Sequence, residues 1–406
     1  MKKTQLVISV AITLVICLVA CQKMLPPLPA DEDVLDGPIA GLSTQENQQF
    51  LAGDVAFSEV FTKENGLGPY FVASSCMSCH AGDGKGHPST TLTRFGQSDT
   101  IGNFFMQYGA PQLQNRAIPG YNPEIIPSGA ASAKFTPPSN TGLGFLAALT
   151  DAQILANADP FDSDGDGISG VPNYINPPSY FIPQSFHQSF AGKYIGRFGK
   201  KAAAIDLLHQ TVNAYNQDMG ITTIYAPYEP GMNGLTFPYP DDVPDPEVSS
   251  NTVLNIVFYL RTLKAPVQRN QHDADVITGK QIFSTIKCAS CHTPEWTTGA
   301  SDISALSYKT FYPYSDLLLH DMGSGLDDGY TEGTAKTYEW RTPPLWGLGL
   351  AKNSQGRQYF LMHDGRATSI EQAILLHGGE AAISNNLYQA LSVSDKQKLI
   401  KFLESL

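Results

Sequence analysis

The sequence predicts a mainly α-helical fold made of two similar halves, with long loop insertions in the first half. Three observations predict it: a short cysteine–histidine motif occurs twice, two amphipathic segments end alike, and several short motifs repeat in the same order. The 36 Gly and 28 Pro among 406 residues indicate many turns between helices. A hydrophobic content of 42% suffices for a core, and a formal charge of −12 without a Lys/Arg cluster argues against nucleic-acid binding.

The first residues have the features of an export signal. Two lysines precede a nearly continuous apolar stretch over residues 6–20, and Leu18-Val19-Ala20 stands directly before Cys21. That stretch is shorter than the roughly 20 residues that a membrane-spanning helix needs. We therefore predict a lipoprotein signal peptide over residues 1–20 with lipid on Cys21, the alternatives being a plain signal peptide or a membrane anchor. Residues 21–48 predict a tether, and Gln22 favours a periplasmic or cell-surface location on the outer membrane.

The four remaining cysteines fall in two C-x-x-C-H motifs. The first motif is Cys76-Met77-Ser78-Cys79-His80, and the second is Cys288-Ala289-Ser290-Cys291-His292. This spacing is the attachment signature of c-type haem, because two thiols bond to the haem vinyl groups and the adjacent imidazole binds the iron. A disulfide redox pair would not need the histidine, and one zinc site would leave two identically placed histidines to chance. We predict two covalently bound haems c.

Each half fits the plan of a cytochrome c domain, in which one helix precedes the haem motif and another ends the domain. Residues 251–263 and 394–406 both have helical apolar spacing and similar endings. Thr136-Pro137-Pro138 and Thr342-Pro343-Pro344 each precede a Gly-Leu-Gly. Gly196-Arg197 and Gly365-Arg366 each open a segment with helical apolar spacing, the first with Ile205 and the second with Ile370. The pattern predicts two cytochrome c-type domains that arose by internal duplication, an N-terminal one over 49–266 with insertions and a C-terminal one over 267–406.

Several of these motifs resemble those of a known family. Residues 341–345 (RTPPL) and 362–368 (MHDGRAT) look like the C-terminal signature of bacterial di-haem cytochrome c peroxidases, and more closely that of the related di-haem oxidoreductase/peroxidase family. Residues 66–71, 164–170, 196–199, 218–222 and 377–381 also resemble that family. The resemblance extends over roughly residues 50–406. It implies two unlike haems, of which the C-terminal one relays electrons and the N-terminal one binds peroxide.

The resemblance also implies which residue binds the second iron from the other side. The family's sixth ligand follows the H-D-G segment on a helix, and this position holds His377. Ile370 to Leu376 has helical apolar spacing, and His377 closes that face. Bis-histidine coordination, with a lowered potential, is the expectation. His320, Met322 and Met362 are the rivals.

For the first haem, His80 is the expected proximal ligand, and the resemblance implies a Gln and a Glu on the far side. The matching residues are Gln210 and Asp218, so Asp replaces Glu. These two are the predicted catalytic residues, because peroxide cleavage needs a group that accepts and returns a proton. Asp218 could instead hold a turn at Gly220. Glu124, His87 and His209 stay open, and His87 or Met219 could fill the sixth position.

A second departure from the family concerns the route between the haems. Relatives often carry a Trp near the Gly-Arg segment of the first repeat, where this chain has Lys200 after Gly199. All three Trp residues follow the second haem motif. A residue that carries an electron between the haems must therefore be a Tyr or one of these Trp residues.

Two segments are candidates for calcium. Asp162, Asp164 and Asp166 alternate before a Gly, as in the first half of a calcium loop, but position twelve is Asn173. An acidic turn without a metal is the alternative. The resemblance separately implies a calcium held by backbone carbonyls, at Thr342 and Pro344.

Three functions are compatible with the sequence. The first is a peroxidase that reduces hydrogen peroxide with electrons from a small redox protein. The second is an electron-transfer cytochrome with both haems closed, and the third is a di-haem oxygenase or protein-modifying enzyme. The marked difference between the segments after His80 and His292 favours unlike haems, and hence the first.

Overall fold

The computed structural model describes residues 30–97, 103–228 and 243–406. Contacts divide the chain into two units, Met1–Val34 and Leu35–Leu406. In the first unit, the described part contains a 3₁₀ helix over Asp31–Asp33; the predicted signal peptide and Cys21 lie outside the described residues. Within the described ranges, no helix combines the length and apolar character needed to cross a bilayer.

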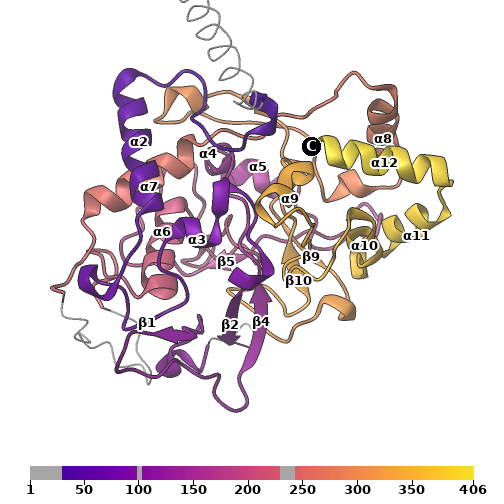
Figure 1. The fold of residues 1–406 in the computed structure, drawn as a ribbon. Helices are drawn as coiled ribbons and strands as arrows, with labels where there is room; N and C mark the ends of the chain where they lie inside the picture. Colours follow the sequence, from indigo (N-terminus) through magenta and orange to yellow (C-terminus); the bar gives the residue numbers. More distant parts are fainter. Residues whose placement is uncertain (1–29, 98–102, 229–242) are drawn as a thin grey trace, which may run out of the picture. The chain divides into compact units, whose positions relative to one another are not determined.

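The second unit is mainly helical, as predicted, and it contains both cysteine motifs (Figure 1). Its α-helices are short apart from four of 12 to 15 residues. The described α-helices of this unit are α2 (Thr44–Ser58), α3 (Cys76–Cys79), α4 (Leu143–Ala147), α5 (Asp151–Leu155), α6 (Leu207–Asn213), α7 (Ser250–Thr262), α8 (Ala274–Thr285), α9 (Ala351–Ser354), α10 (Ile370–Leu375), α11 (Ala382–Ala390) and α12 (Val393–Ser405).

The described strands form antiparallel pairs rather than a larger sheet. The longest pair joins β2 (Leu92–Gly96) to β4 (Ala131–Phe135), with Leu92 opposite Phe135. The others are β1 (Tyr70–Phe71) with β3 (Arg116–Ala117), β5 (Tyr174–Ile175) with β6 (Tyr194–Ile195), β7 (Trp296–Thr297) with β8 (Thr310–Phe311), and β9 (Leu319–Asp321) with β10 (Glu339–Arg341). Five of these strands, β2 to β6, lie between the first haem motif and residue 200, in the half where long loop insertions were expected.

Helix α2 packs against α7, and their side chains form the core of the N-terminal half (Figure 1). Helix α2 begins at a capping box, in which Ser43 and Glu46 satisfy each other's backbone N–H groups. Helix α7 begins where the Ser249 side chain accepts a hydrogen bond from the Thr252 N–H. The two backbones approach closely because Gly53 lies at the contact, where a Cβ would overlap the Asn255 carbonyl.

Helices α8 and α12 form a matching pair in the C-terminal half (Figure 1). Asp273 caps α8 by accepting hydrogen bonds from the N–H groups of Asp275 and Val276. Gly279 lies at the contact, where a Cβ would overlap the carbonyl oxygen of Lys398. Both helix pairs therefore use one glycine to bring two backbones together.

Replacing Gly279 with alanine should lower the free energy of unfolding by about 1–3 kcal/mol, because the added methyl group would overlap the α12 backbone. Chemical denaturation of the haem-loaded protein measures this loss. Gly325→Ala is the matched control, since a Cβ at Gly325 would meet no atom within 4 Å. Equal effects of the two substitutions would mean that the close packing of α8 on α12 is not what Gly279 provides.

The helix that follows Gly196-Arg197 begins later than the sequence pattern indicates. Ile205 was expected on the helix, but α6 starts at Leu207, because Asp206 caps it by accepting a hydrogen bond from the His209 N–H at 2.7 Å. Arg197 is fully buried instead, and it donates to the Leu149 carbonyl and to Asp151. The Gly196-Arg197 segment therefore does not start the helix, and its arginine forms a buried ion pair with Asp151 instead.

Candidate functional site

Both cysteine motifs open into one cavity of about 400 Å³ in the second unit. The structure brings together residues that are more than 200 positions apart in the sequence, and all four described cysteines are free thiols. Apolar side chains from both core clusters contribute to the walls, among them Leu146, Phe198, Phe283 and Leu403. The motif residues in the lining are Cys76, Cys79, His80, Cys288, Cys291 and His292.

The first motif forms the single turn of helix α3. Ser75 caps this turn by accepting a hydrogen bond from the Ser78 N–H at 3.1 Å, and the His80 N–H donates to the Cys76 carbonyl at 3.0 Å. Cys76 and Cys79 are three residues apart on a helix and therefore share one face. Burial raises the pKa of Cys76 to about 12 and of Cys79 to about 11, and lowers that of His80 to about 4. The imidazole is therefore neutral, which is the form that binds a metal.

Both predicted catalytic residues lie in the same cavity as the first motif. Gln210 is on α6, which continues into a π-helical turn over Ala214–Asp218 that ends with Asp218. Single π-helical turns occur frequently at functional sites. The same stretch adds two buried hydroxyl groups without a hydrogen-bond partner, those of Thr211 and Tyr215.

Asp218 has the electrostatic environment of an acid–base group. Burial raises the pKa of its carboxyl group to about 7, and the positive charge of Arg94 opposes the shift. The negative charge of Asp218 in turn raises the pKa of Cys76 and Cys79, which places the carboxylate close to the motif. Arg94 is held by Gln217 at 2.7 Å and by Glu332 at 2.8 Å. Asp218 can therefore gain or lose a proton near neutral pH.

The second motif faces a second histidine that is oriented in the same way. His292 Nδ1 lies 2.9 Å from the Tyr314 carbonyl, and His377 Nδ1 lies 2.7 Å from the Ala373 carbonyl. A carbonyl partner fixes the proton on Nδ1 and leaves Nε2 free to bind a metal. Burial is the main cause that lowers the pKa of both rings, and the charge of His377 also acts on His292. Both imidazoles line the cavity.

His320, a rival ligand in the same cavity, has both ring nitrogens engaged. Nε2 lies 2.7 Å from Asp316 Oδ2, and Nδ1 lies 2.8 Å from Glu380 Oε2 and 3.5 Å from Cys291 Sγ. The charge of Asp316 raises the pKa of His320 against the effect of burial, so the ring is an imidazolium. Glu380 also accepts a hydrogen bond from Ser169. A protonated ring between two carboxylates has no free nitrogen for iron, which favours His377.

The alternative residues considered for the far side of the first haem differ in whether they line the cavity. Met219 lines the cavity. His87, His209 and Glu124 are not part of its lining: His87 caps a 3₁₀ helix at Pro88–Thr90, His209 accepts a hydrogen bond from the Ile205 N–H, and Glu124 accepts one from the Gln114 N–H. Met219 is therefore the remaining candidate for the sixth position. The rivals at the second haem, Met322 and Met362, both line the cavity.

Trp340 on β10 lies in the cavity wall together with Trp346, whereas Trp296 does not. Its ring stacks on His363 with a centroid distance of 3.6 Å and an interplanar angle of 10°. His363 is fixed by a 2.7 Å contact between its Nε2 and Asp328, and the Lys201 ammonium lies 3.9 Å from the Trp340 ring centroid. The structure thus brings a Trp from the C-terminal half next to Lys201, close to where the family resemblance implies a Trp in the first repeat.

The candidate calcium residues have mixed surroundings. Asp162 and Asp164 come together with Asp159, and their oxygen atoms lie within 4.8 Å of one another; Asp166 is not in this group and accepts a hydrogen bond from the Ile168 N–H. The Thr342 carbonyl accepts hydrogen bonds from Ser315 and Arg341, while Pro344 lines the cavity. Calcium at either place stays a prediction.

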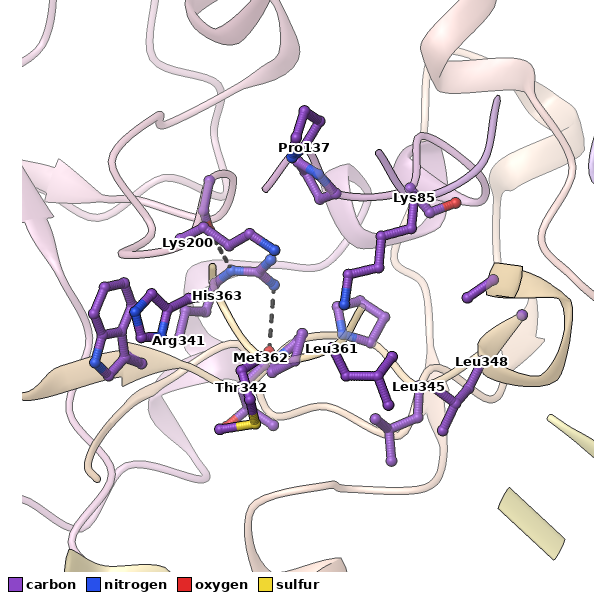
Figure 2. A pocket seen from close by; sticks show the side chains of 18 of the residues that line it. Lys85, Pro137, Lys200, Arg341, Thr342, Leu345, Leu348, Leu361, Met362 and His363 are labelled. Atoms are coloured by element: carbon purple, nitrogen blue, oxygen red, sulfur yellow. Dashed lines mark hydrogen bonds between the residues drawn. The ribbon is translucent and has the colours of Figure 1, made fainter. Parts of the chain in front are cut away.

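The sequence did not indicate three cationic residues of the cavity wall, Lys85, Lys200 and Arg341 (Figure 2). Lys200 and Arg341 occur in segments that were recognised, but a motif gives residue types and not their burial. The Asp316–His320–Glu380 network was also missed, because Asp316 stands in a plain apolar run and only the fold brings it to His320.

The residues of the cavity fit two haem groups. Each motif offers two neutral thiols and a neutral imidazole, and the second motif faces another imidazole with a free Nε2. Apolar walls suit a porphyrin, and buried polar atoms without partners stand near the first motif. This donor set matches haem iron better than zinc, which would use the four thiols together.

Comparison with known proteins gives a family. A family model described as "Di-haem oxidoreductase, putative peroxidase" matches residues 133–406, more than half of the chain. No curated protein matches the sequence. Among solved structures, Kuenenia stuttgartiensis hydrazine synthase (pressurized with 20 bar xenon) is 14% identical over 94% of this chain and 93% of that chain, with a TM-score of 0.40. A MauG-like protein associated with microbial copper homeostasis is 16% identical over 66% of this chain and 89% of that chain, with a TM-score of 0.31.

Proposed function

Because this chain belongs to the di-haem oxidoreductase family, we propose that it is a peroxidase, which reduces hydrogen peroxide to two water molecules with two electrons and two protons. One observation carries the proposal: Asp218, whose pKa is raised to about 7 by burial, lines the same cavity as Cys76, Cys79 and His80. Peroxide cleavage needs a group that takes a proton from one oxygen and delivers it to the other, and such a group works best near the ambient pH.

Each haem is held covalently in this proposal, by Cys76 and Cys79 with His80 on the first iron, and by Cys288 and Cys291 with His292 on the second. The haems supply one-electron iron chemistry and, where a coordination position is open, a place for the oxidant. His377 would hold the second iron together with His292, because its Nε2 is free and both residues line the same cavity. If the attachment is covalent, haem staining stays with the polypeptide on a denaturing gel and is lost when the cysteines become serines.

Asp218 and Gln210 have different roles toward the bound peroxide. Asp218 accepts a proton from the near oxygen of peroxide and returns it to the far oxygen, which leaves as water. Gln210 donates a side-chain hydrogen bond that orients the peroxide, since its side chain lines the same wall. Arg94, fixed by Glu332, keeps the Asp218 pKa from rising further, so that the ionised form exists at neutral pH.

With both haems bound, the cavity wall that contains Trp340 would offer a path for electrons from the second haem to the first. The stacked pair of Trp340 and His363 in the cavity wall suits an electron relay, and it would replace the Trp that the family resemblance implies in the first repeat. The donor is a small redox protein. The acidic chain, with a formal charge of −12, favours a donor with a basic face.

A second function has one observation in its favour. Met219 lines the cavity beside Asp218, and a thioether there could close the first iron, which would make the protein an electron-transfer cytochrome. Electron paramagnetic resonance of the oxidised and half-reduced holoprotein decides between the two. A high-spin ferric signal beside a low-spin one indicates an open iron and the peroxidase; two low-spin signals in both states indicate electron transfer.

We also propose that the two halves arose by duplication, as cytochrome c-type domains over residues 49–266 and 267–406. Gly53 meets Asn255 and Tyr259 on α7, and Gly279 meets Lys398 and Phe402 on α12, with the same four-residue spacing. Six residues after Asn255 and after Lys398, the carbonyls of Arg261 and Glu404 meet Gly144 and Gly349. Equivalent contacts at equivalent spacings support a common origin.

Export and lipid attachment at Cys21 place the protein on the periplasmic or cell-surface side of the outer membrane in this proposal. The basis is the sequence around Cys21 alone. In cell fractionation, the wild-type protein should sediment with membranes, whereas Cys21→Ser should not carry the lipid and should appear in the soluble exported fraction. An unchanged membrane association of the variant would contradict lipid anchoring.

A further inference from the structure

Three cationic side chains share one part of the cavity wall, and none of them is paired with an acidic side chain in the part of the chain that the structure describes. Lys85, Lys200 and Arg341 all line the cavity, and Figure 2 shows their side chains directed toward the same space. Among the described residues, no hydrogen bond or ion pair joins the Lys85 or Lys200 ammonium to another group. The Arg341 guanidinium donates to the carbonyls of Gly199 and Thr342, at 2.8 and 3.3 Å.

The acids nearest to this cluster already have partners. Asp364, which acts on both lysines, accepts the Arg366 guanidinium at 2.7 Å. Asp316, which acts on Arg341, is held by His320 at 2.7 Å. Burial and the charges of Lys85 and Arg341 together push the pKa of Lys200 far down. Arg341 is buried and both lysines are partly buried, so three like charges in one wall are costly unless an anion joins them.

The cluster lies where the two halves of the molecule meet. The Arg341 N–H donates to the Lys200 carbonyl at 3.1 Å, which joins β10 to the segment after Gly196-Arg197. The positive charge of Lys200 acts on His80, the iron ligand of the first motif. Asp316, which faces Arg341, also acts on His292 of the second motif. Lys200 and Arg341 therefore lie where the two halves are joined, in the same cavity wall as Lys85 and in the cavity that contains His80 and His292.

We propose that Lys85, Lys200 and Arg341 form a carboxylate-binding site that holds the propionate groups of the haems where the two haem sites face each other. The inference rests on the proposed di-haem function, because the propionates are the carboxylates that such a cavity would receive. Each haem carries two propionates, enough to neutralise three cations. Arginine and lysine bind carboxylates by charge-assisted hydrogen bonds. By holding both haems from one side, the cluster would fix their mutual position and raise their potentials.

The test uses the haem-loaded protein, with the midpoint potential of each Fe(III)/Fe(II) couple and the propionate bending band in resonance Raman spectra as readouts. Lys200→Gln should shift the propionate band to lower frequency, because a hydrogen bond is lost. It should also disfavour reduction of the haem bound by His80 by about tenfold, or 59 mV for one electron. Lys200→Arg, which keeps the charge and the donors, should retain both properties. Lys134→Gln, at an exposed position on β4, is the control for the loss of one charge.

Other outcomes overturn the inference. A lower potential with an unchanged propionate band would mean that Lys200 acts on the iron from a distance. Equal effects of Lys200→Gln and Lys200→Arg would indicate a change of packing. A shift of the wild-type potentials on addition of acetate at constant ionic strength would show that the cluster binds a carboxylate from solution. Neither the midpoint potentials nor the Raman band depends on peroxide turnover, so both test this inference separately from peroxidase activity. A purified protein without haem absorbance would instead contradict the proposed function itself.

Discussion

Replacing His377 with methionine should raise the midpoint potential of the second haem by a substantial part of the roughly 0.8 V that axial ligands can span. An imidazole stabilises ferric iron more than a thioether does, and methionine–histidine haems have higher potentials. The structure favours His377 as the ligand because its Nδ1 is bound to the Ala373 carbonyl, so that Nε2 is free, and because both His377 and His292 line the cavity. Spectroelectrochemical titration of the purified holoprotein measures the shift.

His377→Gly should leave the second iron without its sixth ligand and convert its low-spin signal into a high-spin one. Met322→Leu and Met362→Leu are the matched controls, because both sulfur atoms belong to cavity residues and leucine has nearly the volume of methionine. Neither control should change the spin state. If His377→Gly keeps a low-spin second haem while one of the leucine variants loses it, that methionine is the ligand and the assignment of His377 is wrong.

The haem attachment residues could be predicted from the sequence because covalent attachment needs a fixed local spacing. Residues 76–80 and 288–292 each form one short turn, so that the motif and the site coincide. The long helices were predictable for a similar reason: the pattern over 251–263 and 394–406 agrees with α7 and α12 to within one residue. In both cases the information lies within a single stretch of the chain.

The rest of the cavity depends on contacts between distant segments, which one sequence does not reveal. Lys200 and Arg341 meet only because the two halves pack together, and Trp340 stacks on His363 although 22 residues of chain separate them. Burial lowers the pKa of His377, whereas two carboxylates raise the pKa of His320 despite its burial. Residue type alone cannot distinguish these two histidines.

Asp218→Asn should lower kcat/KM for hydrogen peroxide by about 10²–10⁴-fold, the usual contribution of a positioned acid–base group. This corresponds to roughly 3–5 kcal/mol of lost transition-state stabilisation. Burial raises the pKa of Asp218 to about 7, so the carboxyl group is mostly protonated below that pH and cannot accept a proton. We therefore expect the wild-type kcat/KM to fall about tenfold per unit as the pH drops below about 7.

Glu124 provides a matched control for this assignment. Its pKa is also raised to about 7 by burial, but it is not part of the cavity lining and accepts a hydrogen bond from the Gln114 N–H at 2.7 Å. Glu124→Gln, which keeps the shape, should retain both activity and the decline below pH 7. Asp218→Glu should retain that decline at reduced rate, whereas Asp218→Asn should abolish it. Loss of the decline in Glu124→Gln but not in Asp218→Asn would show that the proton acceptor is not in this cavity, and the peroxidase assignment would lose the observation that carries it.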